Sequence, residues 1–153
     1  MLQISLAPQA DSRPPAHWKP GAHPWIYEIG RGLYAQWYPR TVDGDELRAF
    51  VQEVEQLVLS HRTPYAWVMF VDGLLGVNAA QRKVIADHVA RMRSHDRRYC
   101  AGGGIVASTP FARGLVTAVF WLSPLVYPHE VFRYIDRAEA YARDRLRERL
   151  LRT

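Results

Sequence analysis

The sequence is short of the features on which secreted, membrane-spanning and thiol-dependent proteins rely. Its 153 residues include one cysteine, Cys100, so neither an internal disulfide nor a thiolate metal cluster can form, and a reducing compartment is expected. The longest nearly uncharged run, Gly114 to Tyr127, is interrupted by Pro124 and falls short of the roughly 20 residues that cross a bilayer. The first residues carry no secretory signal. We therefore expect a cytoplasmic protein with no membrane span.

A strong excess of one charge is also missing. The chain has 20 Lys and Arg against 15 Asp and Glu, which gives a formal net charge of +5. Of the 20 basic residues, 18 are arginine. Genome base composition produces such a bias without selection for binding, so a nucleic-acid partner is not expected. Hydrophobic residues make up 48% and charged residues 23% of a length typical of one domain, which predicts a single folded unit.

The histidines form no recognisable metal site. His17 and His23 precede the first expected strand, His61 lies in a loop, and His88 and His95 stand seven residues apart on or just past a helix. Metal ligands in proteins come as clustered sets, so we predict no metal site. His88 is interpreted as a partly buried polar residue on an apolar helix face.

Catalytic pairings are missing as well. Asp72 follows a predicted central strand, where α/β proteins tend to bind ligands, but no second carboxylate, nucleophile or base can be paired with it. A turn-stabilising role is the alternative for this carboxylate. Gly102 to Gly104 lie within a strand and match no phosphate-binding loop, so close backbone packing is the better interpretation. We predict no catalytic residues and no cofactor.

The local patterns predict one α/β domain, residues 25–150, after a flexible Pro-rich N-terminal arm at residues 1–24. The domain begins with a β-hairpin, because the alternating segments Trp25–Ile29 and Leu33–Tyr38 flank Gly30-Arg31-Gly32. Further strands are expected at residues 65–71, 99–107 and 131–135.

Four helices are predicted from capping residues and apolar periodicity. Each start carries a signal: Asp43 with Glu46, Asn78 with Gln81, Ser108 or Thr109 before Pro110, and Asp136 with Glu139. The first helix is expected to end near Ser60. In the third helix, the residues expected to face the sheet are Phe111, Leu115, Ala118, Val119 and Leu122.

The element order is therefore ββαβαβαβα: an N-terminal hairpin followed, after the first helix, by βαβαβα. Right-handed crossovers then place about four helices over a mixed sheet of about five strands. We predict an α/β fold of this architecture.

Several short motifs set on this order are similar to those of one known family. They are Val71-Asp72-Gly73, Gln81-Arg82, Arg113-Gly114, Trp121-Leu122-Ser123-Pro124, Tyr127-Pro128 and Phe132. On these residues, the segment 25–145 resembles the SpoIIAA-like branch of the STAS superfamily. The resemblance implies that the α/β fold is a STAS-like single domain.

It also implies a small regulatory or scaffold domain that docks other proteins, as the anti-sigma-factor antagonists of that family do. Those antagonists are switched by phosphorylation of a serine at the start of the helix after the third strand. No Ser, Thr or Tyr occurs from Val71 through Arg93, so this switch is expected to be absent. The docking surface that the resemblance carries over is Asp72, Gly73, Leu74, Leu75, Gly76, Val77 and Asn78.

A second candidate surface is apolar and lies after the third helix. It consists of Trp121, Leu122, Leu125 and Tyr127, which fit a partner-binding patch, the lip of a lipid pocket or a plug of the core. Two functions stay open. The leading hypothesis is a non-enzymatic protein-interaction module whose partner is an unidentified regulator or a second copy in a homodimer. The alternative is a small-ligand or lipid carrier, because STAS-like domains are similar in layout to lipid-exchanging Sec14 domains.

Overall fold

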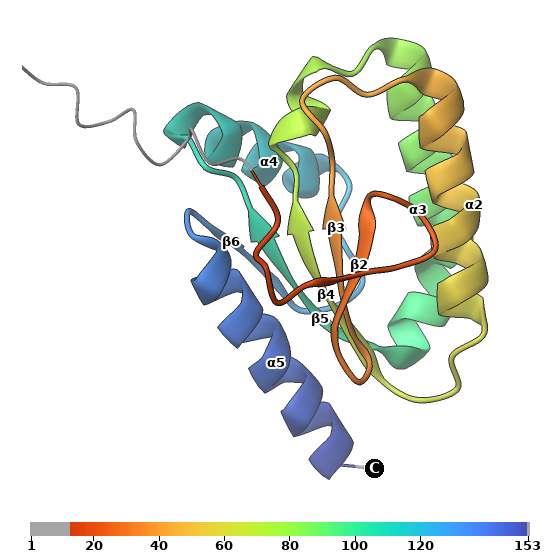
Figure 1. Cartoon of the computed structure of the whole chain (residues 1–153), viewed down its shortest axis with the longest axis vertical. Coiled ribbons are helices and arrows are strands. Elements are labelled where there is room, and N and C mark those ends of the chain that lie inside the picture. The colour runs from red at the N-terminus through yellow and green to blue at the C-terminus, as the bar shows by residue number, and fades with distance from the viewer. Residues whose placement is uncertain (1–12, 153) are drawn as a thin grey trace, which may run out of the picture.

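A computed structural model describes residues 13–152 and has a mixed, six-stranded sheet at its centre (Figure 1). In chain order the elements are β1 (Lys19–Pro20), β2 (Ile26–Gly30), β3 (Leu33–Trp37), α2 (Gly44–Leu59), β4 (Tyr65–Phe70), the 3₁₀ helix η2 (Asp72–Gly76), α3 (Ala79–Tyr99), β5 (Cys100–Val106), α4 (Pro110–Leu122), β6 (His129–Phe132) and α5 (Ile135–Leu151). The prediction of an α/β fold with a mixed sheet is confirmed, and the sheet has one strand more than expected.

The strands follow one another across the sheet in the order β1 to β6. The pairs β1–β2 and β2–β3 are antiparallel, and β3 to β6 are parallel. Because every parallel crossover steps in the same direction, right-handed connections place α2, α3 and α4 on one face of the sheet. Helix α5 covers the opposite face, where Ala138, Ala142 and Leu146 are buried against the strands (Figure 1).

The extra strand, β1, lies within the predicted arm. Lys19 pairs with Glu28 and Pro20 with Tyr27, so β1 forms an edge of the sheet, where proline is tolerated. Next to it, Trp18 is only 4% exposed and packs on the rings of Tyr27 and Trp37. Residues 13–24 therefore differ from the flexible arm that was predicted, while residues 1–12 of that arm lie outside the described residues.

The first hairpin and helix form where predicted. Gly32, between β2 and β3, has a φ of +74°, a conformation that glycine adopts without strain. The Asp43 carboxylate accepts hydrogen bonds from the Asp45 and Glu46 amides, and α2 ends before Ser60. Glu46 is used differently from the prediction, since its Oε1 lies 2.7 Å from Nε2 of the buried His23.

The capping box at the start of α3 is confirmed in full. Gln81 N donates to Asn78 Oδ1 at 2.8 Å, and Asn78 N donates to Gln81 Oε1 at 2.9 Å. The helix runs on to Tyr99, so β5 begins one residue later than predicted. One cause is the buried Tyr65, whose hydroxyl donates to Asp96 Oδ1 at 2.5 Å and fixes the last turns of α3 to β4.

The three glycines of β5 allow neighbouring segments to pack closely on the two faces of this strand. A Cβ on Gly103 would come within 2.9 Å of Tyr127, and a Cβ on Gly104 within 2.3 Å of the Ala138 carbonyl oxygen in α5. Gly102 is covered in the same way by the Arg145 stem. The predicted role in backbone packing is confirmed, because a larger residue would push α5 off the sheet.

Two predictions about the C-terminal third are wrong. Strand β6 spans His129–Phe132, earlier than the predicted 131–135. Helix α5 begins at Ile135 after Tyr134, whose side chain makes no capping hydrogen bond. The predicted capping box of Asp136 with Glu139 does not form, because the Glu139 carboxylate binds residues near the N-terminus instead.

Candidate functional site

The carboxyl edge of the parallel strands brings Asp72 and Ser108 together. Asp72 follows β4 and Ser108 follows β5, and neighbouring parallel strands end at the same edge of a sheet. Ser108 N donates to Asp72 Oδ1 at 2.9 Å, and the Ser108 hydroxyl donates to Asp72 Oδ2. Both carboxylate oxygens thus bind one residue 36 positions away, so Asp72 ties two strand ends together.

Most of the predicted docking loop is occupied in holding the fold. Gly73 is buried so close to the backbone before α2 that a Cβ would lie 2.0 Å from the Pro39 carbonyl oxygen. Val77 is buried and Leu74 packs against the core. Asn78 caps α3. Among the large apolar side chains of residues 72–78, Leu75 is the most accessible, at 37%.

The second predicted surface is divided between solvent and core. Trp121 and Leu122 form the last turn of α4 and are 86% and 89% exposed. Leu125 packs against the core, and the Tyr127 ring lies over Gly103. Burial raises the pKa of the Tyr127 hydroxyl well above its usual range. The sequence pattern had grouped these four residues, and the structure separates them.

Helix α4 faces the sheet with a side that was not predicted. Ala112 is buried, and Val116 and Phe120 are partly buried against the core. The residues expected to face inward are exposed: Phe111 at 73%, Leu115 at 40%, Val119 at 50% and Leu122 at 89%, together with Ala118. That prediction is wrong, because a helix apolar on both sides gives periodicity no way to choose between them.

The outward side of α4 is one continuous apolar surface, which we name the α4 stripe. It consists of Phe111, Gly114, Leu115, Ala118, Val119, Trp121 and Leu122, all of them exposed. At about 100° per residue it covers roughly 160° of the helix circumference. The two polar residues next to it are turned to local partners, since Arg113 donates to the Ala107 carbonyl and Thr117 to the Arg113 carbonyl.

The area of the stripe is large for a domain that stands alone. Aromatic side chains carry about 150–250 Å² each, and Phe111 and Trp121 are 73% and 86% exposed. With its three aliphatic side chains, the stripe reaches or exceeds the roughly 300–600 Å² of the largest apolar patch on a typical monomer. Patches of this size mark interaction surfaces.

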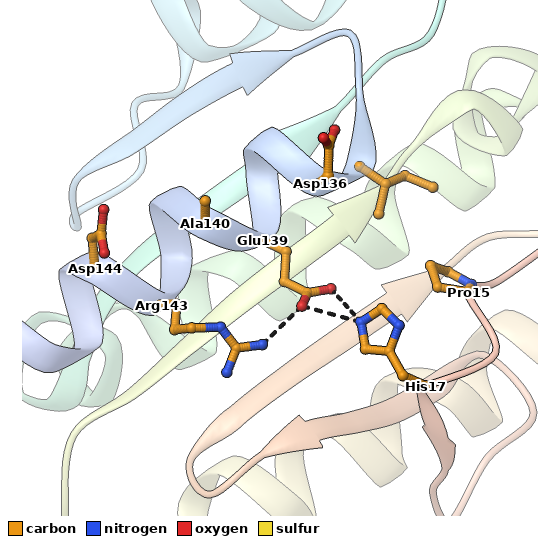
Figure 2. A pocket seen from close by; sticks show the side chains of 8 residues that line it. Pro15, His17, Asp136, Glu139, Ala140, Arg143 and Asp144 are labelled. Carbon is orange, nitrogen blue, oxygen red and sulfur yellow. Dashed lines mark hydrogen bonds and ion pairs between the residues drawn. The ribbon is translucent and has the colours of Figure 1, made fainter.

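A shallow groove of about 490 Å³ lies between the N-terminal segment and α5 (Figure 2). Glu139 on its floor accepts from Trp18 Nε1 at 3.0 Å, His17 Nε2 at 2.9 Å and Arg143 at 2.8 Å. Burial acts to raise the pKa of Glu139, but these three hydrogen bonds outweigh it and hold the pKa below its usual value. A carboxylate engaged by three donors fastens the segment to α5 and is poorly placed to accept a proton.

A partly buried polar cluster occupies the opposite, amino edge of the sheet. Burial raises the pKa of Asp96, and the hydrogen bond from Tyr65 opposes this only in part. Burial also raises the pKa of the nearby Cys100 thiol, which therefore lacks the thiolate character of a reactive cysteine. At the same edge, Tyr34 Oη lies 2.6 Å from His61 Nε2. The cluster joins the end of α3 to the start of two strands.

Residues 13–152 hold neither a cluster of metal-binding side chains nor a helix that could span a membrane. Within this range, no group of three or more His, Cys, Asp and Glu side chains is arranged to hold a metal ion. None of the helices described here has the length and apolar character needed to span a bilayer. His88 binds Glu55 across the two helices α2 and α3, at 2.8 Å, which agrees with its interpretation as a partly buried polar residue.

Several of these contacts have no local signal in the sequence. His17, Trp18 and Glu139 are far apart in the chain and belong to no motif, so the groove could not be foreseen. The Asp72–Ser108 pair does have a signal in the sequence, because each residue follows one of two neighbouring parallel strands. In comparisons with models of known families, with curated proteins and with solved structures, nothing matches this chain.

Proposed function

We propose that this chain is a non-enzymatic regulatory or scaffold domain of the SpoIIAA-like kind, which acts by binding another polypeptide through the α4 stripe. The observation that carries the proposal is that α4 is apolar around almost its whole circumference and is packed on one side only. A helix of this composition is normally covered on all sides. In this proposal, the partner polypeptide covers the exposed side of α4.

The chemistry of the stripe favours a polypeptide with an uncharged, apolar surface. No residue of the stripe carries a charge or a hydrogen-bonding side chain apart from the Trp121 indole. Interface cores are depleted of charge and enriched in aromatic residues. Trp121 and Phe111, exposed at opposite ends of the stripe, have the character of the anchor residues that dominate binding energy.

The alternative functions find less support in the described residues. Asp72, the best acidic candidate, has both carboxylate oxygens engaged by Ser108, which makes it a poor general base. The space above Gly103 and Gly104, where a carrier would need room for a ligand, is filled by Tyr127 and the α5 backbone. These contacts favour a binding module over an enzyme or a carrier.

The test is co-purification of the full chain from its native cell, with and without Trp121→Glu. Because Trp121 is 86% exposed, the substitution leaves the fold intact while placing a charge in the proposed contact. Leu151→Glu is the matched control, since Leu151 is 81% exposed but lies at the end of α5. We expect binding to be lost with Trp121→Glu and kept with Leu151→Glu. Equal binding by all three proteins, or binding by none together with no self-association, would refute the proposal.

A further inference from the structure

We propose that the polypeptide covering the α4 stripe is a second copy of this chain, bound antiparallel about a two-fold axis that passes between Val116 and Thr117. This rests on the function proposed above and specifies its partner. Isologous contact of one patch with itself is the commonest form of assembly in soluble proteins. The stripe meets the requirement of such a contact, which is to be complementary to its own image.

The complementarity follows from the order of large and small residues along α4. In an antiparallel pair centred on this axis, Leu115 of one copy faces Ala118 of the other, and Val119 faces Gly114. Phe111 faces Leu122 at each end. Each central pairing thus places a branched side chain against a small residue of the other copy. The branched side chains fill the spaces above the small residues, and the two helix backbones approach closely.

The glycine in this pattern has no function within one copy. Gly114 is exposed in the interior of α4, where glycine costs about 1 kcal/mol relative to alanine. A Cβ at this position would meet nothing within 4 Å. The space above Gly114 is therefore free in the single copy, and in the antiparallel pair it is the notch that receives Val119.

The size and charge of the stripe also fit self-association. A standard interface buries about 800 Å² per partner, and the five large side chains of the stripe supply most of that area. Each copy has a net charge of +5, but no charged side chain lies in the stripe. A lipid surface is a poorer match, because helices that lie on membranes carry Lys and Arg beside their apolar face, and Arg113 donates to the Ala107 carbonyl instead.

The first test is the molar mass of the full chain in solution, measured by light scattering over a range of concentrations. We expect twice the monomer mass of 17.6 kDa. Ala118→Arg, at the notch near the centre of the contact, should raise the dissociation constant of the dimer by at least about 100-fold, because it buries an unpaired charge against Leu115 of the other copy and brings two like charges near the two-fold axis. Trp121→Glu is the second variant, and Leu151→Glu should leave the dimer unchanged.

Cross-linking tests the antiparallel geometry. A mixture of Phe111→Cys and Leu122→Cys proteins should be joined by a short bis-maleimide linker, while either protein alone should not. The native Cys100 is buried and does not compete. Cross-linking of Phe111→Cys to itself would indicate a parallel pair and overturn the proposal.

The remaining outcomes separate this inference from the function on which it rests. A monomer that binds a different polypeptide through the stripe overturns the dimer and leaves the proposed function standing. A monomer with no stripe-dependent polypeptide binding overturns both, as does Trp121-dependent binding to vesicles of phosphatidylcholine and phosphatidylglycerol. A dimer that resists Ala118→Arg and Trp121→Glu forms through another surface, which also overturns the inference.

Discussion

Glu139 connects residues that are more than 120 positions apart, and its charge is what makes the connection. Replacing Glu139 with Gln keeps the size of the side chain but weakens the hydrogen bonds from His17, Trp18 and Arg143. We expect the free energy of unfolding to fall by about 1.5–3 kcal/mol, the usual value of hydrogen bonds to a charged group. Urea denaturation measures this, and Glu148→Gln, which removes a local pair on the exposed side of α5, should have a smaller effect.

Glu139 also makes the stability of the protein depend on pH. Because the pKa of Glu139 is lower in the folded protein, its contribution to stability is present above the unfolded Glu pKa of about 4.3 and is lost as the pH falls through the folded pKa. The stability of Glu139→Gln should therefore approach that of the wild type below this range. A difference that stays constant from neutral pH to about pH 2 would contradict the prediction.

Asp96 should show a pH dependence of the opposite sign. Burial raises its pKa in the folded protein, so its favourable contribution is complete below the unfolded Asp pKa of about 3.9 and is lost as the pH rises through the folded pKa. Asp96→Asn keeps an acceptor for the Tyr65 hydroxyl. The free energy of unfolding of Asp96→Asn, relative to that of the wild type, should increase from about pH 3 to pH 7, as measured by denaturation at a series of pH values.

At the scale of elements, the contact of β5 with α5 depends on the absence of a side chain at Gly104. Gly104→Ala places a Cβ within 2.3 Å of the Ala138 carbonyl oxygen, a backbone atom that cannot turn aside. We expect the free energy of unfolding to fall by roughly 1–3 kcal/mol, the usual cost of overpacking. Gly44→Ala is the matched control, since nothing lies within 4 Å of a Cβ there. A thermal melt of both variants compares them directly, and equal midpoints would refute the packing role of Gly104.

The elements that the sequence predicted well are those with a local signal. The caps at Asp43 and Asn78 and the turn at Gly32 need only neighbouring residues, and each forms as expected. Strand β1 has two residues and is held by the burial of Trp18, a contact with residues later in the chain. Glu139 had the spacing of a capping residue, but partners at the other end of the chain took its carboxylate.

Helix α4 shows why the candidate site was only partly predictable. Trp121 and Leu122 were placed in a candidate surface that could also be a plug of the core. Phe111, Leu115, Ala118, Val119 and Leu122 itself were expected to face the sheet. Both sides of the helix are apolar, so hydrophobic periodicity could not tell which one faces the sheet. Ala112, Val116 and Phe120 face the core through contacts with distant parts of the chain, which a local pattern does not contain.

At the scale of the whole molecule, the described part of the N-terminal segment belongs to the folded domain. Removing residues 1–24 would take away β1 and uncover the face of Tyr27 and Trp37 on which Trp18 packs. Loss of one buried tryptophan costs about 3–5 kcal/mol, so we expect the melting temperature to fall by many degrees. Leu151→Ala removes a side chain that is 81% exposed at the end of α5, outside the α4 stripe, and should leave the melting temperature nearly unchanged.

The position of α5 has a consequence for the order in which this protein acquires its structure. Within residues 13–152, every strand precedes α5 in the chain, and α5 is the helix that packs on this face of the sheet, opposite α2, α3 and α4. During synthesis, that face stays wet until the last of these helices has left the ribosome. Trp18 is synthesised early, but its partner Glu139 is synthesised only with α5. The two faces of the sheet are therefore covered at different times, and the face that α5 covers stays exposed to chaperones for longer.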